Sequence, residues 1–214
     1  MVLNRRSLLF TAALAASVPF GGQGPAFADT SILNVSYDPT REFYKEFNAA
    51  FAAKWEADTG ETVNIAVLAE SSALYLDQVA GSSALQPHNW VGQHIPLHAT
   101  SNGKVLLSGL DESALDAALG KLASYTPRTI TGRAKFREEL ARVREQGYAV
   151  AVDELEVGLT AVAAPIRNAH GDVVASMSVS GPSFRLPEDR LTEVVRLVVS
   201  AAEEVSHRLG WGHR

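Results

Sequence analysis

The chain has 214 residues, of which 46% are hydrophobic and 20% are charged, and it contains no cysteine. This composition is typical of a globular protein that can bury one sizeable core. The lack of cysteine excludes disulfides, thiolate nucleophiles and cysteine-ligated zinc. The formal net charge is −5, and no cluster of basic residues follows the N-terminal segment, which argues against nucleic-acid binding by this chain alone.

Residues 1–28 have the organisation of an export signal. Arg5 and Arg6 precede an apolar run from Leu8 to Phe20, which is too short to span a bilayer. Ala26-Phe27-Ala28 then has the small-residue pattern of a cleavage site. The arginine pair is compatible with a general-secretory or a twin-arginine route. We expect the protein to be periplasmic or exported if this signal functions.

A strand and a helix are expected directly after the signal. The strand covers Ile32 to Tyr37, and the helix begins with Asp38 as its N-cap and Pro39 in its first turn. The helix should end near Gly60, which suits a C-cap. Its apolar face is formed by Phe43, Phe47, Ala50 and Phe51.

The rest of the chain alternates between short apolar runs and longer periodic segments. Apolar runs bounded by turn residues predict extended segments at 63–68, 74–79, 85–95, 148–152, 159–166 and 173–180. Helical spacing predicts helices at 101–109, after the cap Asp111, at 134–146 and at 187–209. Antiparallel strands with helices grouped on the faces of the sheet make an α+β domain.

The junction before the helix at 101–109 has the features of an anion site. Pro96 stops any helix from running through it, and Thr100 or Ser101 suits the N-cap. The helix would begin with free N–H groups and no bulky side chain over them, which is a pocket for a small carboxylate. On periodicity alone, an ordinary capped helix is the better explanation.

Three serines alternate along the strand predicted at 173–180. Ser176, Ser178 and Ser180 should share one face, and Met177 and Val179 should point to the core on the other. A half-exposed strand with a polar outer face would give the same pattern. The alternative is that the serine hydroxyls line a pocket.

No motif assigns an enzyme, a metal or a cofactor. His94 and His98 are four residues apart, but Pro96 between them prevents both from lying on one helix. The adjacent carboxylates of Asp153 and Glu154 have no sign of separated pKa values and so do not make an acid–base pair. Patterns of the kind H-E-x-x-H, G-x-S-x-G and G-x-G-x-x-G are absent from the sequence. We therefore predict a protein that is not an enzyme and needs no cofactor.

Several segments, in order, resemble the C-terminal effector-binding domain of IclR-type transcription regulators. The resemblance covers about residues 59–214. It rests on TGETVNIAVL at 59–68, LYLDQV at 74–79, PLHATSNGKVLL at 96–107, SYTPRTIT at 124–131, ELARVREQGYAV at 139–150 and the long run ELEVGL to SFRL at 154–186.

The resemblance implies a ligand pocket between the helix start and the serine-bearing strand, with His98 in a structural hydrogen bond beside it. The implied ligand is a small carboxylate or other polar metabolite, and the implied assembly is a homodimer or tetramer. The candidate ligand-binding residues are Ser101, Asn102, Gly103, Asp153, Leu159, Ala161, Ser178 and Ser180.

The N-terminal part resembles a different family. The run SILNVSYDPTREFYKEF within 31–63 is similar to the start of periplasmic sulfate-binding proteins. Sulfate binding itself is not expected, because the other anion-holding loops of that family do not follow. The implied organisation is a signal at 1–28, a strand–helix segment at 29–58 and the effector-binding domain at 59–214. Alternatives are an exported solute-binding fragment and a fusion artefact joined near 58–63, whereas the effector-domain resemblance alone implies a cytoplasmic protein.

A winged helix-turn-helix needs three helices and a wing, and the roughly thirty residues after the signal are too few for one. We therefore expect purified protein not to bind DNA directly. An electrophoretic mobility assay with promoter DNA should show no shift. A sequence-specific shift that weakens with salt would contradict this expectation.

Overall fold

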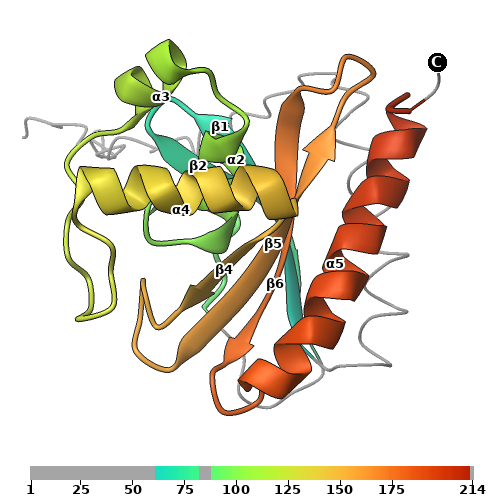
Figure 1. Cartoon of the computed structure of the whole chain (residues 1–214). Helices are drawn as coiled ribbons and strands as arrows, with labels where there is room; N and C mark the ends of the chain where they lie inside the picture. Colours follow the sequence, from blue (N-terminus) through green and yellow to red (C-terminus); the bar gives the residue numbers. More distant parts are fainter. Residues whose placement is uncertain (1–60, 82–87, 213–214) are drawn as a thin grey trace, which may run out of the picture. The chain divides into compact units, whose positions relative to one another are not determined.

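The computed structural model describes residues 61–81 and 88–212. The signal, the strand and the helix expected within residues 1–60 lie outside these ranges. The described part is a mixed α+β fold built on one six-stranded antiparallel sheet, as the sequence predicts, with the strand order β3-β2-β1-β6-β5-β4 (Figure 1). The strands are β1 (Thr62–Ala69), β2 (Ser72–Val79), β3 (His94–Pro96), β4 (Ala149–Val152), β5 (Leu159–Arg167) and β6 (Val173–Pro182).

Four helices accompany the sheet in the described ranges. They are α2 (Ser101–Ser108), α3 (Glu112–Ala118), α4 (Arg133–Gln146) and α5 (Glu188–Arg208). Figure 1 shows α5 on one side of β5 and β6, with α2 and α4 on the other. None of these helices is both long and apolar enough to cross a membrane.

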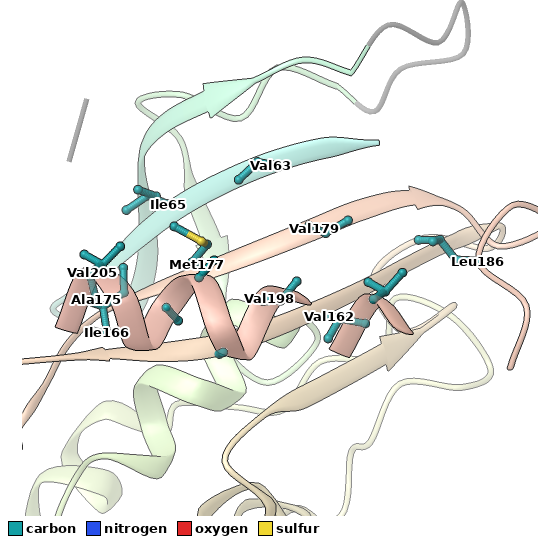
Figure 2. Packing of buried hydrophobic residues seen from close by; sticks show 14 residues of the cluster. Val63, Ile65, Val162, Ile166, Ala175, Met177, Val179, Leu186, Val198 and Val205 are labelled. Atoms are coloured by element: carbon teal, nitrogen blue, oxygen red, sulfur yellow. The ribbon is translucent and has the colours of Figure 1, made fainter. Parts of the chain in front are cut away.

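Helix α5 and one face of the sheet enclose an apolar core (Figure 2). The strands β1, β5 and β6 each contribute alternate residues to it, because successive side chains point to opposite faces. The fully or almost fully buried members include Val63, Ile65, Val162, Ile166, Ala175, Met177, Val179, Val194, Val198 and Val205. The helix predicted at 187–209 thus packs its apolar side on the sheet.

The other face of β6 carries the three serines. Ser176, Ser178 and Ser180 are buried, with at most 6% of each residue exposed. The alternation predicted from the sequence is therefore confirmed, and the strand does not have a half-exposed polar face. A second apolar core lies among α2, α3, α4, β2 and β3, and includes Tyr75, Leu97, Leu106, Leu107, Leu115, Phe136 and Leu140.

The prediction of an extended segment at 85–95 is wrong for residues 88–93, which do not form a strand. Only His94–Pro96 forms a strand, and the chain turns at Val91 and Gly92, where Gly92 has a φ of 78°. The Gly92 N–H donates to the Tyr75 carbonyl at 2.8 Å, so the turn stays attached to β2. A left-handed glycine breaks the extended geometry that the flanking residues would otherwise adopt.

The start of α2 is fixed by a cap and by a close backbone contact. Thr100 is the N-cap, and its hydroxyl oxygen accepts from the Gly103 N–H at 3.1 Å while its hydroxyl donates to the Pro96 carbonyl at 3.0 Å. A Cβ atom at Gly103 would lie only 2.1 Å from the Leu97 carbonyl oxygen. The helix can therefore approach the preceding segment only with glycine at this position.

Replacement of Gly103 by alanine should lower the free energy of unfolding by about 2–4 kcal/mol, because the added methyl group would collide with backbone that cannot move aside cheaply. Urea denaturation monitored by circular dichroism measures the loss. The matched control is Gly120→Ala, where nothing lies within 4 Å of the position that the added methyl group would take. Equal stability of the two variants would contradict the packing described for α2.

Candidate functional site

A cavity lies between the start of α2, the strands β1, β5 and β6, and the loop after β4. It holds about 420 Å³ of space free of protein atoms, its open mouth included, and the centre of a water molecule can occupy about 30 Å³ of that space. Its lining residues are Asn64, Tyr75, Trp90, Ala99, Thr100, Ser101, Ala151, Glu154, Leu155, Leu159, Ala161, Ser178 and Ser180. The narrow interior suits a ligand of few heavy atoms.

Two walls of the cavity carry hydrogen-bond donors. On the α2 wall, the backbone N–H group of Ser101 has no acceptor among the described residues, as expected for the first turn of a helix. On the β6 wall, Ser178 Oγ accepts from Asn102 Nδ2 at 2.8 Å, and Ser180 Oγ accepts from Asn64 Nδ2 at 3.1 Å. Each serine hydroxyl can still donate one hydrogen bond, and both serines line the cavity.

Five of the eight candidate residues from the sequence line this cavity. They are Ser101, Leu159, Ala161, Ser178 and Ser180. The structure brings them together from α2, β5 and β6, although they are as far apart in sequence as residues 101 and 180. Their binding of a ligand stays a prediction.

Asn102 and Gly103 stand behind the cavity wall and do not line it. Asn102 is fully buried and holds Ser178 through its side-chain amide. Gly103 lies against Leu97 and donates its N–H to the Thr100 cap. Both residues position the donors that face the cavity.

Asp153 also does not line the cavity, because it closes the turn after β4. It has a φ of 56°, and its Oδ1 accepts from the Gly158 N–H and from Ser183 Oγ, both at 2.8 Å. These two hydrogen bonds, the one from Ser183 first, hold the pKa of Asp153 below its usual range. The neighbouring carboxylate, Glu154, is the one that reaches the cavity.

Glu154 belongs to a buried ion cluster around Lys104. The Lys104 ammonium donates to Glu154 Oε1 at 2.6 Å, to Glu139 Oε1 at 3.1 Å and to the Val150 carbonyl at 3.1 Å. Lys104 is 1% exposed and Glu154 is 8% exposed. Burial raises the pKa of the Glu154 carboxyl above its ordinary value, and Lys104 partly offsets that rise. The second oxygen, Oε2, is buried and has no hydrogen-bond partner among the described residues.

The turn at 124–131 fixes the backbone beside this carboxylate. The Thr129 hydroxyl donates to the Glu154 carbonyl at 2.6 Å, and the Thr126 hydroxyl donates to the Asp153 carbonyl at 2.6 Å. Both threonines are buried. The segment SYTPRTIT thus acts as a support for the loop that carries Glu154.

Part of the cavity lining is aromatic. Tyr75 and Trp90 lie with their ring centroids 6.4 Å apart, and both line the cavity. Burial raises the pKa of the Tyr75 hydroxyl to about 12, and the Asn102 side chain partly offsets the shift. The phenol therefore stays protonated at neutral pH and can donate a hydrogen bond.

His98 takes a structural position next to this region. Its Nε2 donates to the Ala123 carbonyl at 2.8 Å, since a carbonyl oxygen only accepts. Its ring packs near Tyr125 and Phe136. This is the structural hydrogen bond that the resemblance implies for His98.

Sequence reasoning did not select Asn64, Tyr75, Trp90, Lys104 or Glu154 as site residues. Asn64 could have been noticed as the polar residue between two core positions of its strand, Val63 and Ile65. The pairing of Lys104 with Glu154 joins residues fifty positions apart, and no local pattern in the sequence reports it.

Comparison with known proteins identifies the family. The family model described as "Bacterial transcriptional regulator IclR C-terminal" matches residues 49–207, and the chain belongs to the IclR family of transcription regulators. The match begins within the segment 29–58 that the sequence analysis assigned to a sulfate-binding-like element. It gives no support to that assignment.

Individual relatives agree with this family. The acetate operon repressor of Salmonella typhimurium is 36% identical over 157 residues, which are 72% of this chain and 57% of the repressor. The chain therefore spans little more than half the length of that relative. The crystal structure of the C-terminal domain of the Escherichia coli regulator KdgR superposes with a TM-score of 0.71 at 30% identity, covering 79% of this chain and 99% of that one.

A third relative was solved with a small molecule. The inducer-binding domain of a double mutant of the PobR transcription factor from Acinetobacter, in complex with 3-hydroxybenzoic acid, superposes with a TM-score of 0.69 at 29% identity. The alignment covers 78% of this chain and 97% of that one.

Replacement of Lys104 by methionine should lower the free energy of unfolding at pH 7 by about 3 kcal/mol, because it leaves the buried Glu154 charge without its partner. The deficit should shrink as the pH falls toward 5. An acid whose pKa is raised by folding binds its proton more readily in the folded state, so acidification stabilises the folded protein relative to the unfolded one.

Urea denaturation of wild type and variant at both pH values measures this effect. The exposed Lys121, which lies before α4, provides the control Lys121→Met. A deficit for Lys104→Met that is no larger than that of Lys121→Met, or one that grows on acidification, would contradict the burial and charge state described for the cluster.

Proposed function

We propose that residues 59–214 are the ligand-sensing domain of an IclR-type regulator and that they bind a small carboxylate or other polar metabolite. The observation that carries the proposal is one cavity with donors on two facing elements. Ser101 presents its N–H group at the start of α2, and Ser178 and Ser180 present hydroxyls from β6.

A carboxylate can move from water into a protein cavity only where hydrogen-bond donors such as these surround it. Burying an anion is costly unless hydrogen bonds replace its hydration shell, and a carboxylate has two oxygens that accept several of them. Helix N-terminal N–H groups favour negative charge through their dipoles as well as through hydrogen bonding. The hydroxyls of Ser178 and Ser180 complete the set from the opposite side.

The PobR relative supports the ligand class. That domain is described in complex with 3-hydroxybenzoic acid, which is a small carboxylic acid. The cavity in this chain has less free interior than an aromatic acid requires, since the centre of a water molecule explores only about 30 Å³ of it. We infer that its ligand is smaller than a benzoate or that the aromatic end formed by Tyr75 and Trp90 opens on binding.

We also propose that the protein has the general role of its family. The relatives are transcription regulators, so the domain would act by sensing and not by catalysis, without a cofactor, and as a homodimer or tetramer. The expectation that this chain alone does not bind DNA belongs to the same proposal. The exported alternative concerns residues 1–58, which lie outside the described ranges, and no described feature favours it.

Isothermal titration calorimetry with small carboxylates such as acetate, propionate and glycolate tests the proposal. Wild-type protein should bind at least one of them saturably. The double variant Ser178→Ala/Ser180→Ala should bind at least tenfold more weakly, because it removes both hydroxyl donors from the cavity.

The control is Ser176→Ala on the same face of β6. Ser176 is equally buried but does not line the cavity, and its hydroxyl has only a long contact of 3.4 Å to the Ala66 carbonyl. Circular dichroism establishes that each variant is folded. Unchanged affinity in the double variant would overturn the assignment of the serines to the binding site.

A further inference from the structure

We propose that the cavity selects carboxylates that also carry a hydrogen-bond donor, a hydroxyl or an ammonium group, and that Glu154 Oε2 accepts that hydrogen bond. The inference rests on the proposed function, because it adds a second contact to the same ligand. It predicts a preference among carboxylates that the donor groups of α2 and β6 do not by themselves create.

The first support is the state of the Glu154 carboxylate. Glu154 is more than nine-tenths buried and lines the cavity. Its Oε1 accepts a hydrogen bond from the Lys104 ammonium at 2.6 Å, whereas its Oε2 is buried and has no hydrogen-bond partner among the described residues. A buried carboxylate oxygen without a donor is strongly unfavourable, so the position calls for a donor that the described residues do not supply.

Lys104 cannot provide a second hydrogen bond. An ammonium group has three N–H donors, and Lys104 already directs them to Glu154 Oε1, Glu139 Oε1 and the Val150 carbonyl. The donor for Oε2 must therefore come from another group. The cavity that Glu154 lines is the place from which such a group can come.

The carboxylate also cannot withdraw from the cavity by moving its backbone. The Glu154 carbonyl accepts from the Thr129 hydroxyl at 2.6 Å, and the preceding Asp153 carbonyl accepts from the Thr126 hydroxyl at 2.6 Å. Asp153 closes its turn through Gly158 and Ser183. The loop is thus fixed at the position where Oε2 lacks a donor.

A second unpaired acceptor lies in the same cavity. Asn64 is 1% exposed and lines the cavity. Its Nδ2 donates a hydrogen bond to Ser180 Oγ, and its Oδ1 is buried without a hydrogen-bond partner among the described residues. The cavity therefore contains two kinds of group, donors at α2 and β6 and acceptors at Glu154 and Asn64.

Only a ligand with both functions satisfies both sets. A carboxylate with a keto or methyl substituent would set an oxygen or an apolar group against Oε2. A hydroxyl or ammonium substituent would pair with it.

Calorimetry with three carboxylates of equal chain length tests the inference: propionate, pyruvate and lactate, the last as each enantiomer. 3-Hydroxypropionate is added to place the donor one carbon further away. At least one of the hydroxy acids should bind tenfold or more tightly than propionate and pyruvate. In Glu154→Gln this preference should fall to less than about threefold, because the loss of the ionised acceptor removes a charge-assisted hydrogen bond.

The matched control is Glu139→Gln. Glu139 also pairs with Lys104 but does not line the cavity, so the variant should keep the preference for the hydroxy acid. Loss of the preference in both variants would show that Glu154 acts only by holding Lys104, and would overturn the inference. If Glu154→Gln does not fold, the affinities of the wild-type protein for hydroxy, keto and unsubstituted acids still test the inference, because equal affinities would contradict it.

The outcomes separate this inference from the proposed function. Equal affinity for all the carboxylates, with loss of binding in Ser178→Ala/Ser180→Ala, would overturn the role of Glu154 and leave the sensing site intact. The absence of any carboxylate binding by folded wild-type protein would overturn both proposals. A hydroxy-acid preference that only Glu154→Gln removes is the result we expect.

Discussion

The structure depends on a strand that must be buried on both faces. Strand β6 pairs with β1 along one edge and with β5 along the other, and its residues 175–181 are buried on both faces. The face toward α5 carries Ala175, Met177 and Val179 and packs as an ordinary apolar core. The opposite face carries serines, and buried hydroxyls need hydrogen-bond partners. Helix α2 and β1 provide those partners through Asn102 and Asn64.

The polar side of β6 therefore does two things at once. Its hydrogen bond to Asn102 holds α2 against the sheet, and Gly103 permits the close approach of the helix to the preceding segment. The hydroxyls of Ser178 and Ser180, which accept from the asparagines, also line the cavity and can each donate one hydrogen bond there. Because these contacts within the chain join the walls, the protein itself sets the shape of the cavity, and binding sites for small molecules are usually pre-formed in this way.

Local patterns in the sequence predicted the α+β fold and five of the residues that line the cavity. The Thr100 cap and the alternation at 175–180 are properties of a few neighbouring residues, so the sequence contains them. The choice between Asp153 and Glu154 is different, because the left-handed backbone at Asp153 decides which carboxylate faces the turn and which faces the cavity. The partners of Lys104 lie on α4 and on the loop after β4, and only the tertiary fold brings them together.

The ion cluster also explains why a charged group can be tolerated beside the cavity. A lone buried carboxylate would gain a proton or force the loop outward, whereas Lys104 keeps the Glu154 charge in place by pairing with one oxygen. Only half of the carboxylate is used in this way. Lys104 thus offsets part of the cost of burying the ionised Glu154, and the other oxygen has no hydrogen-bond donor among the described residues. In the ligand site that we propose, this oxygen would discriminate among ligands that the donors of α2 and β6 would bind alike.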